Sequence, residues 1–126
     1  MKHFILMVTK APFQSENGKM ALAFCRAAIE AGHRINQVFF YQEGVFHSST
    51  WLKPVPGELS LINEWEAFSE QTKTPLKLCV SAAERRGLVN ENAEMELMHS
   101  SFELCGMADY FSEISASKGK LISLQL

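Results

Sequence analysis

The sequence is poor in cysteine and has no paired-cysteine motif. Its 126 residues include three cysteines, Cys25, Cys79 and Cys105, and no two of them have Cys-x-x-Cys spacing. An odd number of isolated cysteines argues against a disulfide framework and against a cysteine-rich zinc site. In a reducing compartment such thiols are either buried side chains or chemically active groups.

Long apolar runs and an excess of one charge are also missing. The formal net charge is −2, so the composition does not indicate an electropositive surface for nucleic acid. The apolar run of residues 3–9 ends at Lys10 without a small-residue cleavage site. No stretch approaches the about 18 apolar residues that span a membrane. We therefore expect a cytoplasmic protein that binds neither nucleic acid directly nor a membrane.

Metal and nucleotide motifs are equally absent. The four histidines, His3, His33, His47 and His99, share no metal-ligand spacing, so we expect no metal site. There is no G-x-G-x-x-G, and position 13 is Phe where a phosphate loop needs its first Gly, so we expect no cofactor. A catalytic Cys–His pair stays open, with His47 and His99 as candidates, because such partners need not be close in sequence.

What the sequence does contain is an alternation of strand and helix patterns. Strands are expected at residues 3–9, 35–41, 76–80, 102–105 and 121–126, and helices at residues 19–31, 59–73, 81–87, 91–98 and 107–117. A helix from residue 101 onward is an alternative to the fourth strand, and residues 45–57 are expected to form a surface loop with at most one turn of helix. This alternation predicts a single domain over residues 1–126, an α/β/α sandwich with a mostly parallel five-stranded sheet. The flavodoxin-like strand order 2-1-3-4-5 is the expected one.

Cys79 is the candidate catalytic residue. Ser81 and Glu84 have the spacing of a capping box, which places the helix start at Ser81 and Cys79 at the end of the preceding strand. A thiol there faces the positive end of a helix dipole and unpaired N–H groups, which favour the thiolate. With strands 1 and 3 as neighbours, Cys79 would lie opposite the loop after strand 1. These residues alone leave a buried strand cysteine as the alternative.

The residues expected near Cys79 each have two interpretations. Lys10 either adds positive charge across the crevice or is simply solvated. Arg85 and Arg86 either offset the negative end of the short helix or contact an acidic partner. Cys25 lies within an apolar helical pattern and is expected to be buried. Cys105 approaches Cys79 if the fourth strand ends there, and is otherwise a buried structural thiol.

Two blocks of the sequence resemble the DsrE/TusD family of sulfur-relay proteins. Residues 38–45 form an apolar strand followed by Tyr-x-Glu-Gly-Val, and residues 78–87 place Cys79 before an Ala-rich turn that ends in Arg-Arg-Gly. The resemblance extends from the first strand to the last and is strongest to the TusD branch. It implies a sulfurtransferase that accepts a persulfide sulfur on Cys79 and relays it to a downstream carrier without a cofactor or metal.

The resemblance also implies partners. TusD-like members form a heterohexamer with homologous TusB-like and TusC-like subunits, take sulfur from a TusA-like donor and pass it to a TusE-like acceptor. Their relay serves the 2-thiouridine modification of tRNA wobble uridine, whereas the DsrE-like branch acts in dissimilatory sulfur oxidation. Besides this DsrE-type role, a non-catalytic assembly subunit and a small-molecule-binding flavodoxin-like module remain as alternatives. The loop at residues 10–14 is less Gly-rich than the family leads one to expect.

Overall fold

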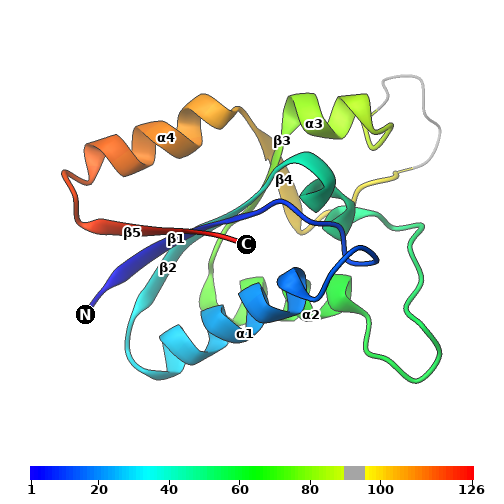
Figure 1. The fold of residues 1–126 in the computed structure, drawn as a ribbon, viewed down its shortest axis with the longest axis horizontal. Coiled ribbons are helices and arrows are strands. Elements are labelled where there is room, and N and C mark those ends of the chain that lie inside the picture. Colours follow the sequence, from blue (N-terminus) through cyan, green and yellow to red (C-terminus); the bar gives the residue numbers. More distant parts are fainter. Residues whose placement is uncertain (90–95) are drawn as a thin grey trace.

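The computed structural model describes residues 1–89 and 96–126, which form a parallel sheet with helices on both faces (Figure 1). In chain order the elements are β1 (His3–Val8), α1 (Asn17–Glu30), β2 (Arg34–Phe40), the 3₁₀ helix η1 (Gln42–Ser48), α2 (Leu61–Thr72), β3 (Leu76–Cys79), α3 (Val80–Arg85), β4 (Phe102–Cys105), α4 (Met107–Ala116) and β5 (Leu121–Gln125). Figure 1 shows α1 and α2 on one side of the sheet and α3 and α4 on the other. The predicted α/β class and five-stranded parallel sheet are confirmed.

The strands follow the order β4-β3-β2-β1-β5. The architecture is flavodoxin-like, an open parallel sheet covered on both faces, but the order differs from the predicted 2-1-3-4-5. The third strand pairs with β2 and β4, and β1 pairs with β2 and β5. Since β2 separates β1 from β3, Cys79 does not face the loop after β1 across a crevice, as the predicted order required.

Burial explains why β2 has a central position. Val38, Phe39 and Phe40 are each 0% exposed, which requires a strand on either side and a helix layer on each face. The two edge strands are less buried: Leu104 in β4 and Ile122 in β5 are each 38% exposed. The strand that buries the longest apolar run therefore lies inside the sheet, and the two half-exposed strands form its edges.

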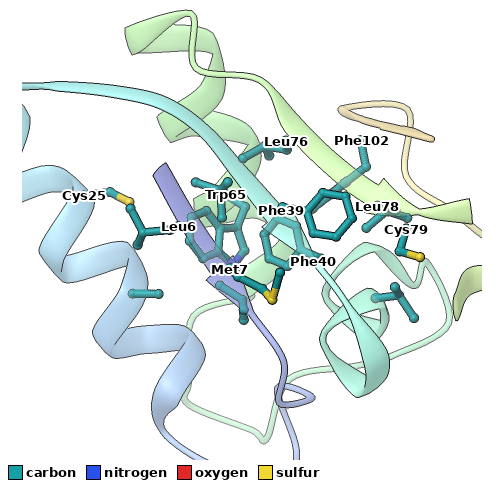
Figure 2. Close-up of a cluster of buried hydrophobic side chains, with 14 of the residues drawn as sticks. Leu6, Met7, Cys25, Phe39, Phe40, Trp65, Leu76, Leu78, Cys79 and Phe102 are labelled. Carbon is teal, nitrogen blue, oxygen red and sulfur yellow. The ribbon is translucent and has the colours of Figure 1, made fainter. Parts of the chain in front are cut away.

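An aromatic cluster fills the space between the sheet and α2 (Figure 2). The Phe40 ring lies at its centre, with the ring centroid of Trp65 at 5.2 Å and that of Phe102 at 5.3 Å. The rings of Phe40 and Trp65 are close to perpendicular, at 89°. Edge-to-face pairs of this kind add to the free energy gained from burial alone. The cluster holds β2, β4 and α2 together beneath the carboxyl end of the sheet.

The opposite face is covered by α4, which connects β4 to β5 across the sheet. The ring of Tyr110 packs on that of Phe39 with a centroid distance of 5.0 Å. The Glu113 carboxylate accepts hydrogen bonds from the side-chain amides of Asn36 and Gln37, both in β2. These contacts fix α4 over the central strand and thereby orient its amino-terminal end, which follows Cys105 directly.

Two expectations about the connecting segments need revision. Residues 42–48 form the 3₁₀ helix η1, in which Gly44, Val45, His47 and Ser48 are buried, so the predicted surface loop begins only after it. The predicted helix at residues 91–98 falls largely on residues 90–95, outside the described part. Residues 96–98 are not helical, and Met98 forms an antiparallel bridge with Ser49.

We predict that Phe40→Ala lowers the free energy of unfolding by about 3–5 kcal/mol, because it removes a fully buried ring and leaves a cavity. Phe111→Ala is the matched control, since that ring is 52% exposed and its loss should cost less than about 1 kcal/mol. Urea unfolding followed by circular dichroism measures both values. Equal losses in the two variants would contradict the assignment of Phe40 to the centre of the core.

Candidate functional site

Cys79 is both the last residue of β3 and the N-cap of α3. Its φ of −64° and ψ of 119° are extended, and the helix begins at the next residue, Val80. The side chain is 4% exposed, and Figure 2 shows it beyond Leu78 at the margin of the buried cluster. The first backbone N–H groups of a helix have no partner within the helix, and they carry the positive end of its dipole. Cys79 therefore lies at the positive end of the α3 dipole.

The predicted helix cap at Ser81 is wrong. Ser81 is the second residue of α3, its side chain is exposed, and no side chain forms a capping hydrogen bond at this end. No loop residue separates β3 from α3, so the chain changes from extended to helical at one peptide unit. The thiol is consequently closer to the start of the helix than the capping-box spacing indicated.

The other end of α3 is closed as the sequence indicated, at Gly87. The Leu88 N–H donates to the Ala83 carbonyl at 3.0 Å, and the Gly87 N–H donates to the Glu84 carbonyl at 3.1 Å. This is a Schellman motif, and it requires the positive φ of 74° that Gly87 adopts. The buried side chain of Leu88 anchors the end of the helix in the core.

An ion pair connects α3 to η1. Nε and Nη2 of Arg86 donate to Oε1 of Glu43 at 2.9 and 2.6 Å, and Nη1 donates to the Ala82 carbonyl at 3.1 Å. Hydrogen bonding and then the charge of Arg86 lower the pKa of the Glu43 carboxyl. Both interpretations of Arg86 are seen: its guanidinium binds a carbonyl at the negative end of α3, and it contacts an acidic group, which belongs to the same chain.

The contact of η1 with β1 depends on a missing side chain at Gly44. A Cβ at that position would lie 2.0 Å from the Val8 carbonyl oxygen, which is far inside van der Waals contact. The Tyr41 N–H donates to the same oxygen at 3.0 Å, so the chain passes from β2 into η1 directly over the end of β1. The Glu43-Gly44 pair and Arg86 thereby lie close together in the folded chain. The sequence alone did not show what these residues contribute to the structure.

Cys105 lies directly beside Cys79. The two residues are paired in the parallel ladder of β3 and β4, and they form its last pair. Cys105 is half-buried, and Gly106, the N-cap of α4, follows it. Burial raises the pKa of the Cys105 thiol, the charge of Lys77 opposes this shift, and nearby negative charges, Cys79 among them, add to it. The fourth strand therefore ends at Cys105, which was the condition for Cys105 to approach Cys79.

The two candidate histidines are engaged elsewhere. His47 is buried, its Nε2–H donates to the Lys10 carbonyl at 3.0 Å, and burial lowers the pKa of its ring to about 4. His99 lies with Nε2 at 3.3 Å from a carboxylate oxygen of Glu66. Over residues 1–89 and 96–126, no hydrogen bond joins either ring to the Cys79 thiol, so no Cys–His pair is seen there.

The remaining candidates do not act on Cys79 directly. Lys10 is exposed at the end of β1, with β2 between it and β3, and its charge helps to lower the pKa of Glu43. Cys25 is 0% exposed within α1, and burial raises the pKa of its thiol to about 12. Its predicted burial is confirmed.

The described residues contain neither a metal-binding cluster nor a membrane-spanning helix. No group of three or more His, Cys, Asp or Glu side chains in residues 1–89 and 96–126 is placed to hold a metal ion. In the same ranges no helix has the length and apolar character needed to cross a membrane.

Fold and site together define an α/β protein with adjacent thiols at the carboxyl ends of two parallel strands. The chain belongs to the DsrE/DsrF-like family, whose model matches residues 2–119. It is 37% identical over 110 residues to "Sulfurtransferase TusD" of Proteus mirabilis, covering 82% of this chain and 85% of that protein. It is 33% identical over 110 residues to "Putative sulfurtransferase DsrE" of Allochromatium vinosum, with the same coverage of 82% and 85%. The crystal structure of the ychN protein from E. coli has the same fold, with a TM-score of 0.70 at 19% identity over 98% of this chain and 100% of that chain.

We predict that Gly44→Ala destabilises the protein by more than about 3 kcal/mol, because the added methyl group meets the backbone of Val8 and not a movable side chain. Gly106→Ala is the control, since a Cβ there has no atom within 4 Å and the change should cost less than about 1 kcal/mol. Thermal unfolding of the two variants measures the difference. A Gly44→Ala protein as stable as the wild type would show that η1 does not need this close approach.

We predict that His47 makes the fold sensitive to acid. Its folded pKa of about 4 lies below the unfolded value of 6.5, so protonation favours the unfolded chain. The contribution of neutral His47 to the free energy of unfolding is complete above pH 6.5 and declines by about 3 kcal/mol as the pH falls to 4. Urea titrations between pH 7.5 and 4 should show the destabilisation by His47→Gln shrinking toward acid. An NMR midpoint for His47 near 6.5 would contradict this prediction.

Proposed function

We propose that this protein, as a single domain of residues 1–126, is a sulfurtransferase that carries sulfane sulfur on Cys79 as a persulfide. The observation that carries the proposal is the position of Cys79, a nearly buried thiol at the N-cap of α3. The printed names of relatives with 33–37% identity, TusD and DsrE sulfurtransferases, support it. Both sulfur transfer and a relay require a thiol in such an electropositive position.

The proposed chemistry needs no cofactor. The Cys79 thiolate attacks the outer sulfur of a donor persulfide, a new S–S bond forms, and the donor leaves as its thiolate. In the second half, an acceptor thiolate attacks the outer sulfur on Cys79, whose thiolate is the leaving group. Stabilising negative charge at the start of α3 helps both halves, because it favours the attacking thiolate first and the departing thiolate later.

The low exposure of Cys79 suits a carrier. At 4% exposure the thiol is shielded from bulk oxidants and from non-specific thiols. A persulfide extends the side chain by one S–S bond of about 2 Å, which brings the transferable sulfur closer to the surface than the thiol itself. The reactive atom is thus presented only after loading.

The proposed destination is the 2-thiouridine modification of tRNA wobble uridine in the cytoplasm. The protein would receive sulfur from a TusA-like donor, deliver it to a TusE-like acceptor and assemble with TusB-like and TusC-like subunits in a heterohexamer. The several relatives named TusD support this destination. A role in sulfur oxidation is the alternative, because the DsrE relative matches over the same share of the chain.

Exposed apolar side chains support contacts with protein partners. Phe13, Trp51, Val55 and Leu59 are 60–78% exposed, and three of them line a cavity of about 330 Å³ between the start of α1 and the start of α2. Clusters of exposed apolar side chains commonly mark sites of protein–protein interaction.

Intact mass spectrometry tests the carrier function. After incubation with a cysteine desulfurase, cysteine and a TusA-like carrier, the wild-type protein should gain one sulfur atom, because Cys79 captures the transferred sulfane sulfur. Cys79→Ser should gain none.

Cys25→Ser and Cys105→Ser are the controls, and both should retain the gain on Cys79. If the wild type gains no sulfur even with its partner subunits present, the carrier function is wrong and an assembly subunit with a packed Cys79 is the better explanation.

A further inference from the structure

We propose that Cys105 is a second sulfur-carrying residue, which exchanges the sulfane sulfur with Cys79 and presents it at the surface. This inference rests on the proposed function of Cys79. Its basis is the ladder of β3 and β4, in which the two cysteines are direct partners and the last pair.

The spacing of the two strands suits transfer of a single sulfur atom. Neighbouring strands lie about 4.8 Å apart, and paired residues of a parallel ladder project from the same face. Two S–S bonds laid end to end span about 4 Å. A sulfur atom between the two cysteine sulfurs therefore fits the near-linear arrangement that thiolate attack on a persulfide requires.

Exposure differs between the two thiols in a way that gives them different tasks. Cys79 is 4% exposed, whereas Cys105 is half-buried in the edge strand β4. Gly106 after it has no side chain, and the space beside it holds no atom within 4 Å of an added Cβ, so the approach to Cys105 from this side is open. A bulky thiol therefore reaches Cys105 more easily than Cys79.

Both thiols also precede a helix. Cys79 is the N-cap of α3, and Cys105 is one residue before Gly106, the N-cap of the ten-residue helix α4. The start of α4 partly offsets the cost of negative charge on the half-buried Cys105 sulfur, and that charge moves only a short distance during transfer. Lys77, two residues before Cys79 on the same strand, is the positive charge that opposes the raised pKa of Cys105.

The transfer step is balanced without an oxidant or reductant. The Cys105 thiol loses its proton to water, and its thiolate attacks the outer sulfur of the Cys79 persulfide. A bond forms between Sγ of Cys105 and that sulfur, and the bond from it to Sγ of Cys79 breaks. The Cys79 thiolate leaves with the electron pair and regains a proton from water, so a persulfide on one residue becomes a persulfide on the other.

The test loads the full chain with inorganic polysulfide, a donor small enough to reach Cys79, removes the excess and compares two acceptors. Cyanide is small enough to take sulfur from Cys79 directly, while coenzyme A is a bulky thiol that depends on Cys105. In Cys105→Ser we expect normal loading of Cys79 and an unchanged rate of thiocyanate formation. Transfer to coenzyme A should fall at least about tenfold, because the thiol positioned beside Cys79 is gone.

Peptide mapping after alkylation locates the sulfur. The wild type should carry it on both Cys79 and Cys105, and Cys105→Ser on Cys79 alone. Sulfur confined to Cys79 in the wild type, with equal rates to coenzyme A in Cys105→Ser, would overturn the inference and leave the carrier function intact. Release of sulfide with a Cys79–Cys105 disulfide would also overturn it. Absence of sulfur from Cys79 in both proteins would refute the carrier function itself.

A separate probe tests the proximity of the two thiols without sulfur transfer. Phenylarsine oxide condenses with two neighbouring thiols and releases water, so the wild type and Cys25→Ser should each bind one equivalent. Cys79→Ser and Cys105→Ser should bind none in the presence of a competing monothiol. Cys105→Ala must reproduce Cys105→Ser with an unchanged circular dichroism spectrum, so that misfolding is not mistaken for loss of the thiol. A wild type that binds no arsenical would contradict the pairing on which the inference depends.

Discussion

The arrangement around Cys79 depends on the close approach of Gly44 to the carbonyl oxygen of Val8. Only a residue without Cβ lets the chain pass over the end of β1, where the Tyr41 N–H donates to the same oxygen. This contact sets η1 beside β3 and α3, and it brings Glu43 to Arg86. The ion pair is partly exposed and contributes little stability by itself, so its effect is to position α3.

The second constraint is the absence of any loop between β3 and α3. Because Cys79 completes the ladder and also caps the helix, its backbone is held by two regular elements at once. A thiol held in this way keeps its orientation through a cycle of loading and unloading. The same ladder places Cys105 beside it, so a single strand pairing provides both the carrier thiol and its neighbour.

Local patterns predicted most of the elements because each pattern has a local cause. The Schellman stop at Gly87 follows from its freedom to adopt a positive φ, and the four-residue strand ending at Cys105 follows from its apolar and extended preferences. The helix start predicted from the capping box at Ser81 was wrong. The strand ladder ends at Cys79 and the helix begins at the next residue, so Ser81 lies inside the first turn. The 3₁₀ helix η1 was missed because it depends on burial against β1 and not on periodicity.

Local patterns of residues predict the α/β class, the approximate bounds of the strands and helices, and Cys79 as the candidate thiol at a strand end. Those features depend on the order of apolar, polar and turn-forming residues along a few neighbouring positions. Only the tertiary structure decided the order β4-β3-β2-β1-β5, the pairing of Cys79 with Cys105 and the contact of Glu43 with Arg86. These features join residues far apart in the chain, and they are selected by how completely β2 can be buried on both faces and both edges.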